Sequence, residues 1–591
     1  MYITDLASWC NICIVDTKSP QYSSPLSYAE KFYVNGKLAT DIIIPDGVTK
    51  IRRNVFYSCY TLKSVTIPDS VICIESGAFY ECSNLTKVVM PDTLTNIADD
   101  AFEETPFFDE AFPEKKFVIE SGVLKKCIGE YSNVFVPKGV KSIGDKAFWD
   151  CSSLASITIP DSVTSIGDEA FWNCSGLTSV TIPDSVTSIG DEAFSACDWL
   201  SSITIGNSVK SIGRSAFSGC KRLTSITIPD SITSIGDYVF ENCSITSITI
   251  PDSVKSIGYR AFYNCTKLTS ITIPDSVTSI DSNAFLKCTN LTSITIPDSV
   301  TSIGLWAFDE CKSLTSVYIT DIAAWCNIDF SSGANPLSYT GGDLYLNDEP
   351  VTSLVIPDSV KSIGNYAFEY CPSLTSITIP DSVTSIGSCA FLKCTSLTSI
   401  TIPDSVTSIG GGAFSGCISL TSVTISDSVT SIDSNAFCNC KSLTEINIVG
   451  NNDSYLSCEG ILYSKDRTKL IAYPAGRKLA DYIIPDSVTS IDSNAFRGCT
   501  NLASITIPDS VTSIGYDAFR GCENITSVTI PYSTLIKSKE AFEESLYEKL
   551  KEENKAINDV RKRQGLCRHC GGKFKGLFSK KCANCGKPKD Y

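Results

Sequence analysis

One phrase of 23 residues recurs along most of this 591-residue chain and constrains its fold more than any other feature. One copy runs from Pro160 to Ile182, and Pro183 begins the next. A period of this length predicts a solenoid in which each copy forms one coil. The phenylalanine of an Ala-Phe step, or of a Val-Phe step at Phe56 and Phe240, marks each coil, at Phe56, Phe79, Phe102, Phe148, Phe171, Phe194, Phe217, Phe240, Phe262, Phe285, Phe308, Phe368, Phe391, Phe414, Phe437, Phe496 and Phe519.

The order of apolar residues within the phrase explains why it coils. Val180 and Ile182 alternate with polar neighbours, as expected of a strand with one buried face. Pro183 ends this strand, because proline donates no hydrogen bond to a sheet. The Ala-Phe step at Phe194 and the following Cys197 are predicted to form one short helical turn. A single coil buries too few apolar side chains to be stable, so neighbouring coils must stack through parallel strands.

The phrase Ile-Pro-Asp-Ser-Val-Thr-Ser-Ile-Gly-x-x-Ala-Phe-x-x-Cys-x-x-Leu resembles the BspA-like leucine-rich repeat family. The resemblance covers the chain from residue 1 to about residue 545. It implies an α/β-type repeat solenoid, mainly β, whose parallel strands coil in a right-handed sense. It also implies a binding function, often that of a bacterial surface adhesin, and no catalytic residues.

Irregular segments divide the repeats, and the N-terminal sequence from Tyr2 recurs inside the chain from Tyr318. The chain therefore starts in mid-coil, and either this segment is a cap or an upstream piece precedes it. A helix after the last repeat is expected to cover the end of the solenoid, with a short coiled coil as the alternative. The expected parts are an atypical N-terminal coil or cap (1–50), an array (51–316), an irregular insert (317–350), a second array (351–444), a second insert (445–484), a third array (485–538), the capping helix (539–564) and a zinc ribbon (565–591).

The chain has 28 cysteines, and 16 of them follow the repeat phenylalanine by three positions. In stacked coils their Cβ vectors run parallel, which is poor geometry for a disulfide, so we expect a ladder of buried free thiols. Cys10 and Cys13 have the spacing of a redox pair. The internal copy of this segment has Asp329 in place of the second cysteine, which favours a structural role.

Four further cysteines form two Cys-x-x-Cys pairs close to the C-terminus. They are Cys567, Cys570, Cys582 and Cys585, and the spacing resembles a zinc ribbon. Four thiolates complete a tetrahedral shell, so we expect structural Zn²⁺ with no open position for catalysis. Zinc is expected to supply most of the folding free energy of so short a segment. His569, which lies inside the first pair, is expected to be a bystander.

Variation among the repeats concentrates after the Ile-Gly step and around the Ala-Phe step. Aromatic residues there are the candidate partner-binding surface, because aromatic side chains supply much of the free energy of protein interfaces; packing across neighbouring coils is the alternative. These residues are Trp149, Trp172, Tyr238, Tyr259, Tyr263, Trp306, Tyr366 and Tyr370. The outward serine and threonine residues form a second surface, which is expected to be uniform filler, with glycan binding as the alternative. The aspartate after each proline is expected to cap its own turn, with attraction of cations as the alternative.

Charge and composition limit the class of function. Residues 561–591 contain 10 lysines and arginines and one acid, so nucleic-acid binding by the basic ribbon is one alternative. The chain has a single histidine and no apparent nucleophile–base pair, which excludes most enzyme classes. Neither a signal peptide nor a membrane span is apparent. The sequence predicts a cytoplasmic, non-catalytic scaffold that binds proteins; a cell-surface adhesin that lacks its export signal is the other alternative.

Overall fold

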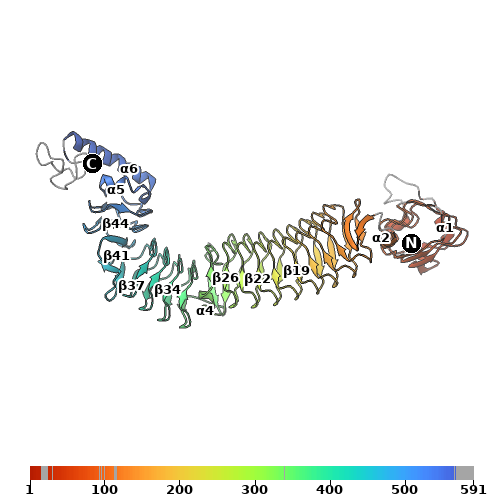
Figure 1. Cartoon of the computed structure of the whole chain (residues 1–591), viewed down its shortest axis with the longest axis horizontal. Helices are drawn as coiled ribbons and strands as arrows, with labels where there is room; N and C mark the ends of the chain where they lie inside the picture. The colour runs from red at the N-terminus through yellow and green to blue at the C-terminus, as the bar shows by residue number, and fades with distance from the viewer. Residues whose placement is uncertain are drawn as a thin grey trace. The chain divides into compact units, whose positions relative to one another are not determined.

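The computed structural model describes residues 1–12, 14, 24–29, 31–91, 93–94, 96–98, 100–111, 116–338, 340–564 and 566. The chain divides into two compact units, Met1–Pro274 and Asp275–Tyr591. Within each unit, successive coils stack through parallel strands (Figure 1). This arrangement confirms the predicted solenoid, mainly β and parallel.

In the first unit each regular coil gives a strand of three or four residues to one sheet and a two-residue strand to another. Register advances by one period, so that Val180 pairs with Ile203. The first family of sheets comprises β4 (Asp41–Ile43), β6 (Ser64–Thr66) and β8 (Lys87–Val89); β12 (Asn133–Phe135), β14 (Ser156–Thr158), β16 (Ser179–Ile182) and β18 (Ser202–Ile205); and β21 (Ser247–Thr249) and β23 (Ser270–Thr272).

The second family of sheets in the first unit contains the short strand that follows the Pro-Asp-Ser turn of each regular coil. It comprises β5 (Lys50–Ile51), β7 (Cys73–Ile74) and β9 (Asn96–Ile97); β10 (Phe117–Glu120), β11 (Val123–Cys127), β13 (Ser142–Ile143), β15 (Ser165–Ile166), β17 (Ser188–Ile189) and β19 (Ser211–Ile212); and β20 (Ser234–Ile235) and β22 (Ser256–Ile257). At the N-terminus a small sheet joins β1 (Tyr2–Ile3), β2 (Tyr33–Val34) and β3 (Lys37–Leu38), next to helix α1 (Leu6–Cys10) and the 3-10 helix η2 (Pro25–Tyr28).

The arc that closes each coil differs from the prediction. Glu192 and Ala196 have φ angles of 52° and 59°, in the left-handed region, so the expected short helical turn around Phe194 and Cys197 is wrong. A helix cannot continue through these residues. Instead, the N–H groups of Glu192, Phe194 and Ala196 donate to carbonyls of the next coil at 2.7, 2.8 and 2.8 Å. The arc therefore adds a third ladder of hydrogen bonds between coils.

The core of the array is a stack of phenylalanine rings. Phe194 is fully buried between Phe171 and Phe217, with ring centroids 4.9 and 5.7 Å apart. The repeat cysteines lie beside this stack, and the thiol of Cys197 donates to the carbonyl of Phe171 at 3.2 Å. Burial raises the pKa of the Cys197 thiol to about 12, so the thiol stays protonated. The repeat cysteine thus packs as a small apolar side chain that satisfies one buried carbonyl.

A short helix and three charged side chains join the two sets of long-strand sheets in the first unit. Helix α2 (Pro106–Ala111) precedes the edge strand β12. The N–H groups of Asn133 and Phe135 donate to the carboxylates of Glu104 and Asp109 at 2.9 and 2.6 Å. Lys116 pairs with Asp109 at 3.0 Å and donates to the carbonyl of Asn133 at 3.2 Å. Buried side chains therefore replace the backbone partners that a preceding strand would supply.

The second unit repeats the same pattern between two inserts. Its sheets are β25 (Ser293–Thr295), β27 (Ser316–Ile319), β29 (Asp343–Leu346) and β30 (Glu349–Pro350); β24 (Ser279–Ile280), β26 (Ser302–Ile303) and β28 (Asp329–Phe330); β31 (Ser353–Val355) and β33 (Ser376–Thr378); β35 (Ser399–Ile402), β37 (Ser422–Ile425) and β39 (Glu445–Ile448); β32 (Ser362–Ile363), β34 (Ser385–Ile386), β36 (Ser408–Ile409) and β38 (Ser431–Ile432); β43 (Asp481–Ile483), β45 (Ser504–Thr506) and β47 (Ser527–Thr529); and β40 (Tyr455–Cys458), β41 (Ile461–Ser464), β42 (Lys469–Ala472), β44 (Ser490–Ile491) and β46 (Ser513–Ile514).

The first insert contains helix α4 (Ile322–Cys326), the strand β28 and a hairpin of β29 and β30. The shared sequence produces the same local structure in both copies: Asp5 caps α1 and Asp321 caps α4. The loop after β28 then covers the coil of Phe368, where the hydroxyl of Ser338 donates to buried Glu369 at 3.0 Å.

Burial raises the pKa of Glu369 to about 7, well above the usual value for a glutamate. The folded state therefore holds this proton more tightly than the unfolded state, and the stability it contributes falls as the pH rises from about 4.5 to about 7. We expect Glu369→Gln to raise the free energy of unfolding at pH 8 by on the order of 1–3 kcal/mol and to change it little at pH 4. Urea denaturation at both pH values measures the difference, and an equal effect at both would contradict this account.

The second insert is an antiparallel meander of β40, β41 and β42, and β42 pairs in parallel with β44. Tyr473 takes the place of the repeat phenylalanine: its ring stacks on Phe496 at 5.0 Å. At the C-terminal end, Phe542 continues the stack on Phe519 at 4.9 Å. Helix α5 (Tyr532–Leu535), the 3-10 helix η3 (Lys539–Ala541) and helix α6 (Glu544–Arg563) follow, and Tyr547 and Leu550 of α6 are buried. The expected C-terminal helix is thus present, and its first turns pack on the last coils.

Candidate functional site

The eight aromatic residues predicted to bind partners all lie on the arc of their coils. Trp149 and Trp306 are 47% exposed, and the other six are half-buried. Five of the eight belong to the first unit, and Trp306, Tyr366 and Tyr370 belong to the second. Within the first unit, the five residues form two separate groups.

The first group, the tryptophan pair, consists of Trp149 and Trp172. Their rings stack with centroids 5.3 Å apart and an interplanar angle of 9°. The two residues are one period apart, so the stacking of coils places them in register. The exposed face of Trp149 offers a flat apolar surface of the kind that dominates protein interfaces.

The second group, the arginine–tyrosine cluster, consists of Arg214, Tyr238, Tyr259, Arg260 and Tyr263. The guanidinium of Arg260 lies 4.8 Å from the Tyr263 ring centroid and 5.3 Å from that of Tyr259. Arg214 lies 4.8 Å from the ring centroid of Tyr238. Here the chain's own cations occupy the aromatic faces, which is the packing alternative considered from the sequence.

Four of the eight aromatic residues occupy a costly backbone conformation. Their φ angles are positive, at 59°, 54°, 60° and 57° for Tyr238, Trp306, Tyr366 and Tyr370. Glycine or asparagine adopts this conformation readily, whereas a bulky side chain raises the free energy by about 1–2 kcal/mol. Other coils place Asn283, Gly412 or Asn435 at the position of Trp306. The backbone conformation at these four positions therefore disfavours aromatic side chains.

We expect Trp306→Asn to raise the free energy of unfolding by about 1 kcal/mol, because asparagine relieves the left-handed strain. Trp149→Asn is the matched control: Trp149 is equally exposed, but its φ is not positive, so no gain is expected. Thermal denaturation of both variants measures the effect. A Trp306→Asn variant less stable than the parent would show that the indole packs more favourably than the strain costs.

Sequence reasoning missed Trp199, which is 50% exposed and has the guanidinium of Arg222 3.5 Å from its ring centroid. The long strands β14, β16 and β18 line a groove of about 950 Å³, bordered by Ser156, Thr158, Ser179, Thr181 and Thr204. Serine and threonine hydroxyls and apolar side chains line this groove together, and it is a second candidate surface.

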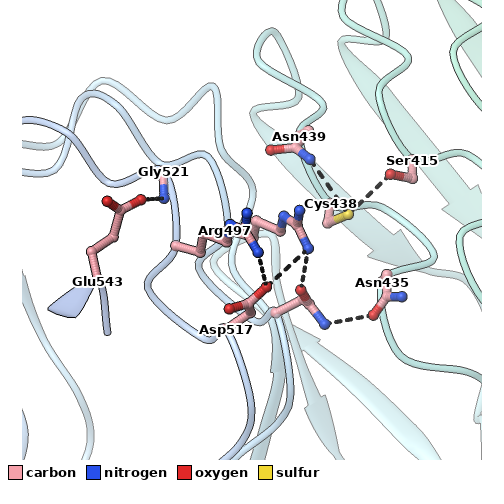
Figure 2. A network of polar contacts seen from close by, with 10 residues as sticks. Ser415, Asn435, Cys438, Asn439, Arg497, Asp517, Gly521 and Glu543 are labelled. Atoms are coloured by element: carbon pink, nitrogen blue, oxygen red, sulfur yellow. Dashed lines mark hydrogen bonds and ion pairs between the residues drawn. The ribbon is translucent and has the colours of Figure 1, made fainter. Parts of the chain in front are cut away.

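A polar network in the second unit connects coils on either side of the second insert (Figure 2). Arg497 donates to Asn494 at 2.9 Å, and Asn494 donates to Asn435 at 2.7 Å. Asp517 accepts ion pairs from Arg497 and Arg520 at 3.4 and 3.0 Å. The adjacent cavity holds about 20 Å³, room for a single water. The bonds of this network run between coils, so we interpret it as a structural join.

The aspartate that follows each proline does not cap its own turn where its bonds are known. Asp184 accepts the N–H of Asn207, and Asp298 accepts the hydroxyl of Thr320, each on the following coil, at 2.7 and 2.8 Å. Among the described residues, no three histidine, cysteine, aspartate or glutamate side chains are grouped to bind a metal ion. At these two coils the aspartate thus serves a contact between coils.

The predicted zinc ligands Cys567, Cys570, Cys582 and Cys585, together with His569, lie outside the described residues. Cys13 also lies outside them. Its partner in the sequence motif, Cys10, is fully buried, and burial raises the pKa of its thiol to about 12. In the described part of the chain, no helix is both long enough and apolar enough to cross a bilayer.

The sequence matches the family model of the BspA type leucine rich repeat region over residues 28–155, 117–246, 233–329, 341–457 and 472–560. No curated protein matches the chain. Among solved structures, a leucine-rich repeat protein from Bacteroides ovatus is 28% identical with a TM-score of 0.38, over 72% of this chain and 95% of that one. A leucine rich cell surface protein from Faecalibacterium prausnitzii is 28% identical with a TM-score of 0.33, over 70% of this chain and 92% of that one.

Proposed function

Because this chain belongs to the BspA type leucine rich repeat family, we propose that it is a non-catalytic scaffold whose coils bind protein partners. The observation that carries the proposal is the set of aromatic residues on the arc. Tyr238, Trp306, Tyr366 and Tyr370 stand in left-handed positions that cost the fold free energy. Tyr238 and Tyr370 also pack against Arg214 and Lys393 of the same chain. The support therefore rests on Trp306 and Tyr366, whose costly backbone conformation favours a role in contacts with other molecules.

The proposal is tested by affinity capture with the full chain, followed by cross-linking to locate each partner. We expect Trp306→Ala combined with Tyr366→Ala to lower recovery of a partner at least tenfold, on the order of 1.4 kcal/mol. Thr204→Arg, which blocks the strand groove, is the control and is expected to leave recovery unchanged. Recovery lost in Thr204→Arg and kept in the aromatic variant would place binding on the hydroxyl surface and refute the aromatic arc.

We propose further that Cys567, Cys570, Cys582 and Cys585 hold one structural Zn²⁺. The support is their paired spacing and the small size of the segment, which leaves it without an apolar core. Metal analysis of the purified chain is expected to give one zinc per chain, and Cys582→Ser is expected to lower it sharply. Cys151→Ser changes a repeat cysteine and is the matched control. Zinc retained in Cys582→Ser would exclude this ligand set.

We propose a cytoplasmic location, since thiolate zinc ligands and many free thiols suit a reducing compartment. Fractionation of cells with an antibody to the chain tests it: recovery only from the cell surface would favour the adhesin alternative.

Retention on RNA or heparin at about 0.3 M salt would favour nucleic-acid binding by the basic residues 561–591, because loose charge attraction is screened at that ionic strength.

A further inference from the structure

The tryptophan pair differs from the other aromatic groups of the first unit in one respect. In the arginine–tyrosine cluster and at Trp199, an arginine of the same chain lies against the aromatic ring. Among the described residues, no lysine or arginine lies over the ring of Trp149 or Trp172. Trp149 is 47% exposed, so its outer face remains open to a cation from outside. Tryptophan is the side chain that binds cations best through its ring.

The surroundings of the tryptophan pair are strongly acidic. Backbone hydrogen bonds hold acidic residues next to the two tryptophans. The N–H of Asp150 donates to the carbonyl of Trp172 at 2.8 Å, and the N–H of Trp172 donates to the carbonyl of Glu169 at 3.0 Å. Glu169 in turn donates its N–H to Asp191 at 2.7 Å. The three coils present one lysine, Lys146, and six carboxylates on this arc, namely those of Asp145, Asp150, Asp168, Glu169, Asp191 and Glu192.

Only one of these carboxylates is neutralised within the arc. Lys146 pairs with Glu169 at 3.3 Å. Asp145 and Asp168 accept backbone N–H groups of the next coil at 3.0 and 2.8 Å, which holds them in place and leaves their charge intact. Glu192 is exposed to solvent. An open indole face surrounded by excess negative charge is complementary to several positive charges in a row.

We propose that the tryptophan pair and these six carboxylates bind a lysine- or arginine-rich segment of a protein partner. One cation of the segment rests on the face of Trp149, and the neighbouring cations meet Asp150, Asp168 and Glu192. This inference deepens the proposed scaffold function and rests on it. The carboxylates speed association and make it depend on salt, while the indole provides a contact that salt screens less.

The test measures the affinity of the full chain for a fluorescent peptide of alternating lysine and glycine, by anisotropy. We expect Trp149→Leu to weaken binding about fivefold, because leucine keeps the apolar bulk and removes the ring. Trp199→Leu is the matched control: Trp199 is as exposed, but Arg222 already occupies its face, so we expect less than about a twofold change. Neither substitution alters the net charge, so general attraction to an acidic chain affects both variants equally.

A second variant tests the carboxylates. Asp150→Asn with Glu192→Gln retains the shapes of both side chains, and we expect about fivefold weaker binding and a flatter dependence on salt. Equal affinity of Trp149→Leu and the parent chain would overturn the proposal, as would an equal loss in Trp199→Leu or equal binding of a glutamate–glycine peptide. If the lysine peptide fails to bind while partner capture still depends on Trp306 and Tyr366, this inference fails and the scaffold function stands.

Discussion

Replacing one ring of the phenylalanine stack, in Phe194→Ala, is expected to lower the free energy of unfolding of the array by about 3–5 kcal/mol. The side chain is fully buried and contacts rings on both neighbouring coils at 4.9 and 5.7 Å. Its removal leaves a cavity that three coils border, and the coils cannot close it because three ladders of hydrogen bonds fix their spacing. Each coil depends on its neighbours for stability, so the loss extends beyond the altered coil.

Hydrogen exchange measures this effect locally. The N–H of Phe171 donates to Ala193, and that of Phe194 donates to Ala216, both at 2.7–2.8 Å. We expect both amides to exchange faster in Phe194→Ala by two orders of magnitude or more, about 3 kcal/mol of local stability. Thr181→Ala is the control, because Thr181 is exposed on the same array and its change is expected to stay within about 0.5 kcal/mol. Similar exchange in the two variants would show that the ring stack is not the main source of stability.

Lys116→Met is expected to destabilise the first unit by about 3–5 kcal/mol at pH 8, because it leaves a buried carboxylate without its cation. The side chains of Lys116 and Asp109 are both fully buried and lie 3.0 Å apart. Burial raises the pKa of Asp109 to about 6, and Lys116 acts against this rise. Without Lys116 the pKa of Asp109 rises further, so in the folded variant Asp109 stays protonated to a higher pH than in the parent chain.

The sign of the pH dependence follows from that raised pKa. A raised carboxyl pKa in the folded state means that stability is present at low pH and lost as the pH increases. The deficit of Lys116→Met is therefore expected to grow between pH 6 and pH 8, as measured by urea denaturation at each pH. The double variant Lys116→Met with Asp109→Asn keeps an acceptor for the N–H of Phe135 and removes the charge, so we expect it to recover part of the loss. A deficit that is constant with pH would contradict this account.

The repeat made the regular coils predictable, because residues one period apart must occupy equivalent positions. Stacking of Phe171 on Phe194 and of Trp149 on Trp172 follows from that rule alone. The contact of Trp199 with Arg222 was available from the same rule, since these residues are also 23 apart. It was missed because only aromatic residues were compared.

Other features depended on information that the repeat does not contain. The helical turn around Phe194 was predicted because Glu192 and Ala196 are ordinary helix formers, and nothing in their identity reveals a left-handed backbone. It is the hydrogen bonds to the next coil that impose this conformation. The join built by Glu104, Asp109 and Lys116 occurs once, so no period marks it. Its partners become apparent only when the chain is folded.

Every regular junction in this protein has the same chemistry, down to the pairing of Val180 with Ile203 one period later. Excising one whole 23-residue copy would therefore unite two surfaces that already match. Even the coil between Phe240 and Phe262, which is one residue short, keeps its rings stacked at 5.4 Å. Unequal recombination within such a gene can add or remove single coils. The length of the solenoid can therefore evolve without changes to its core.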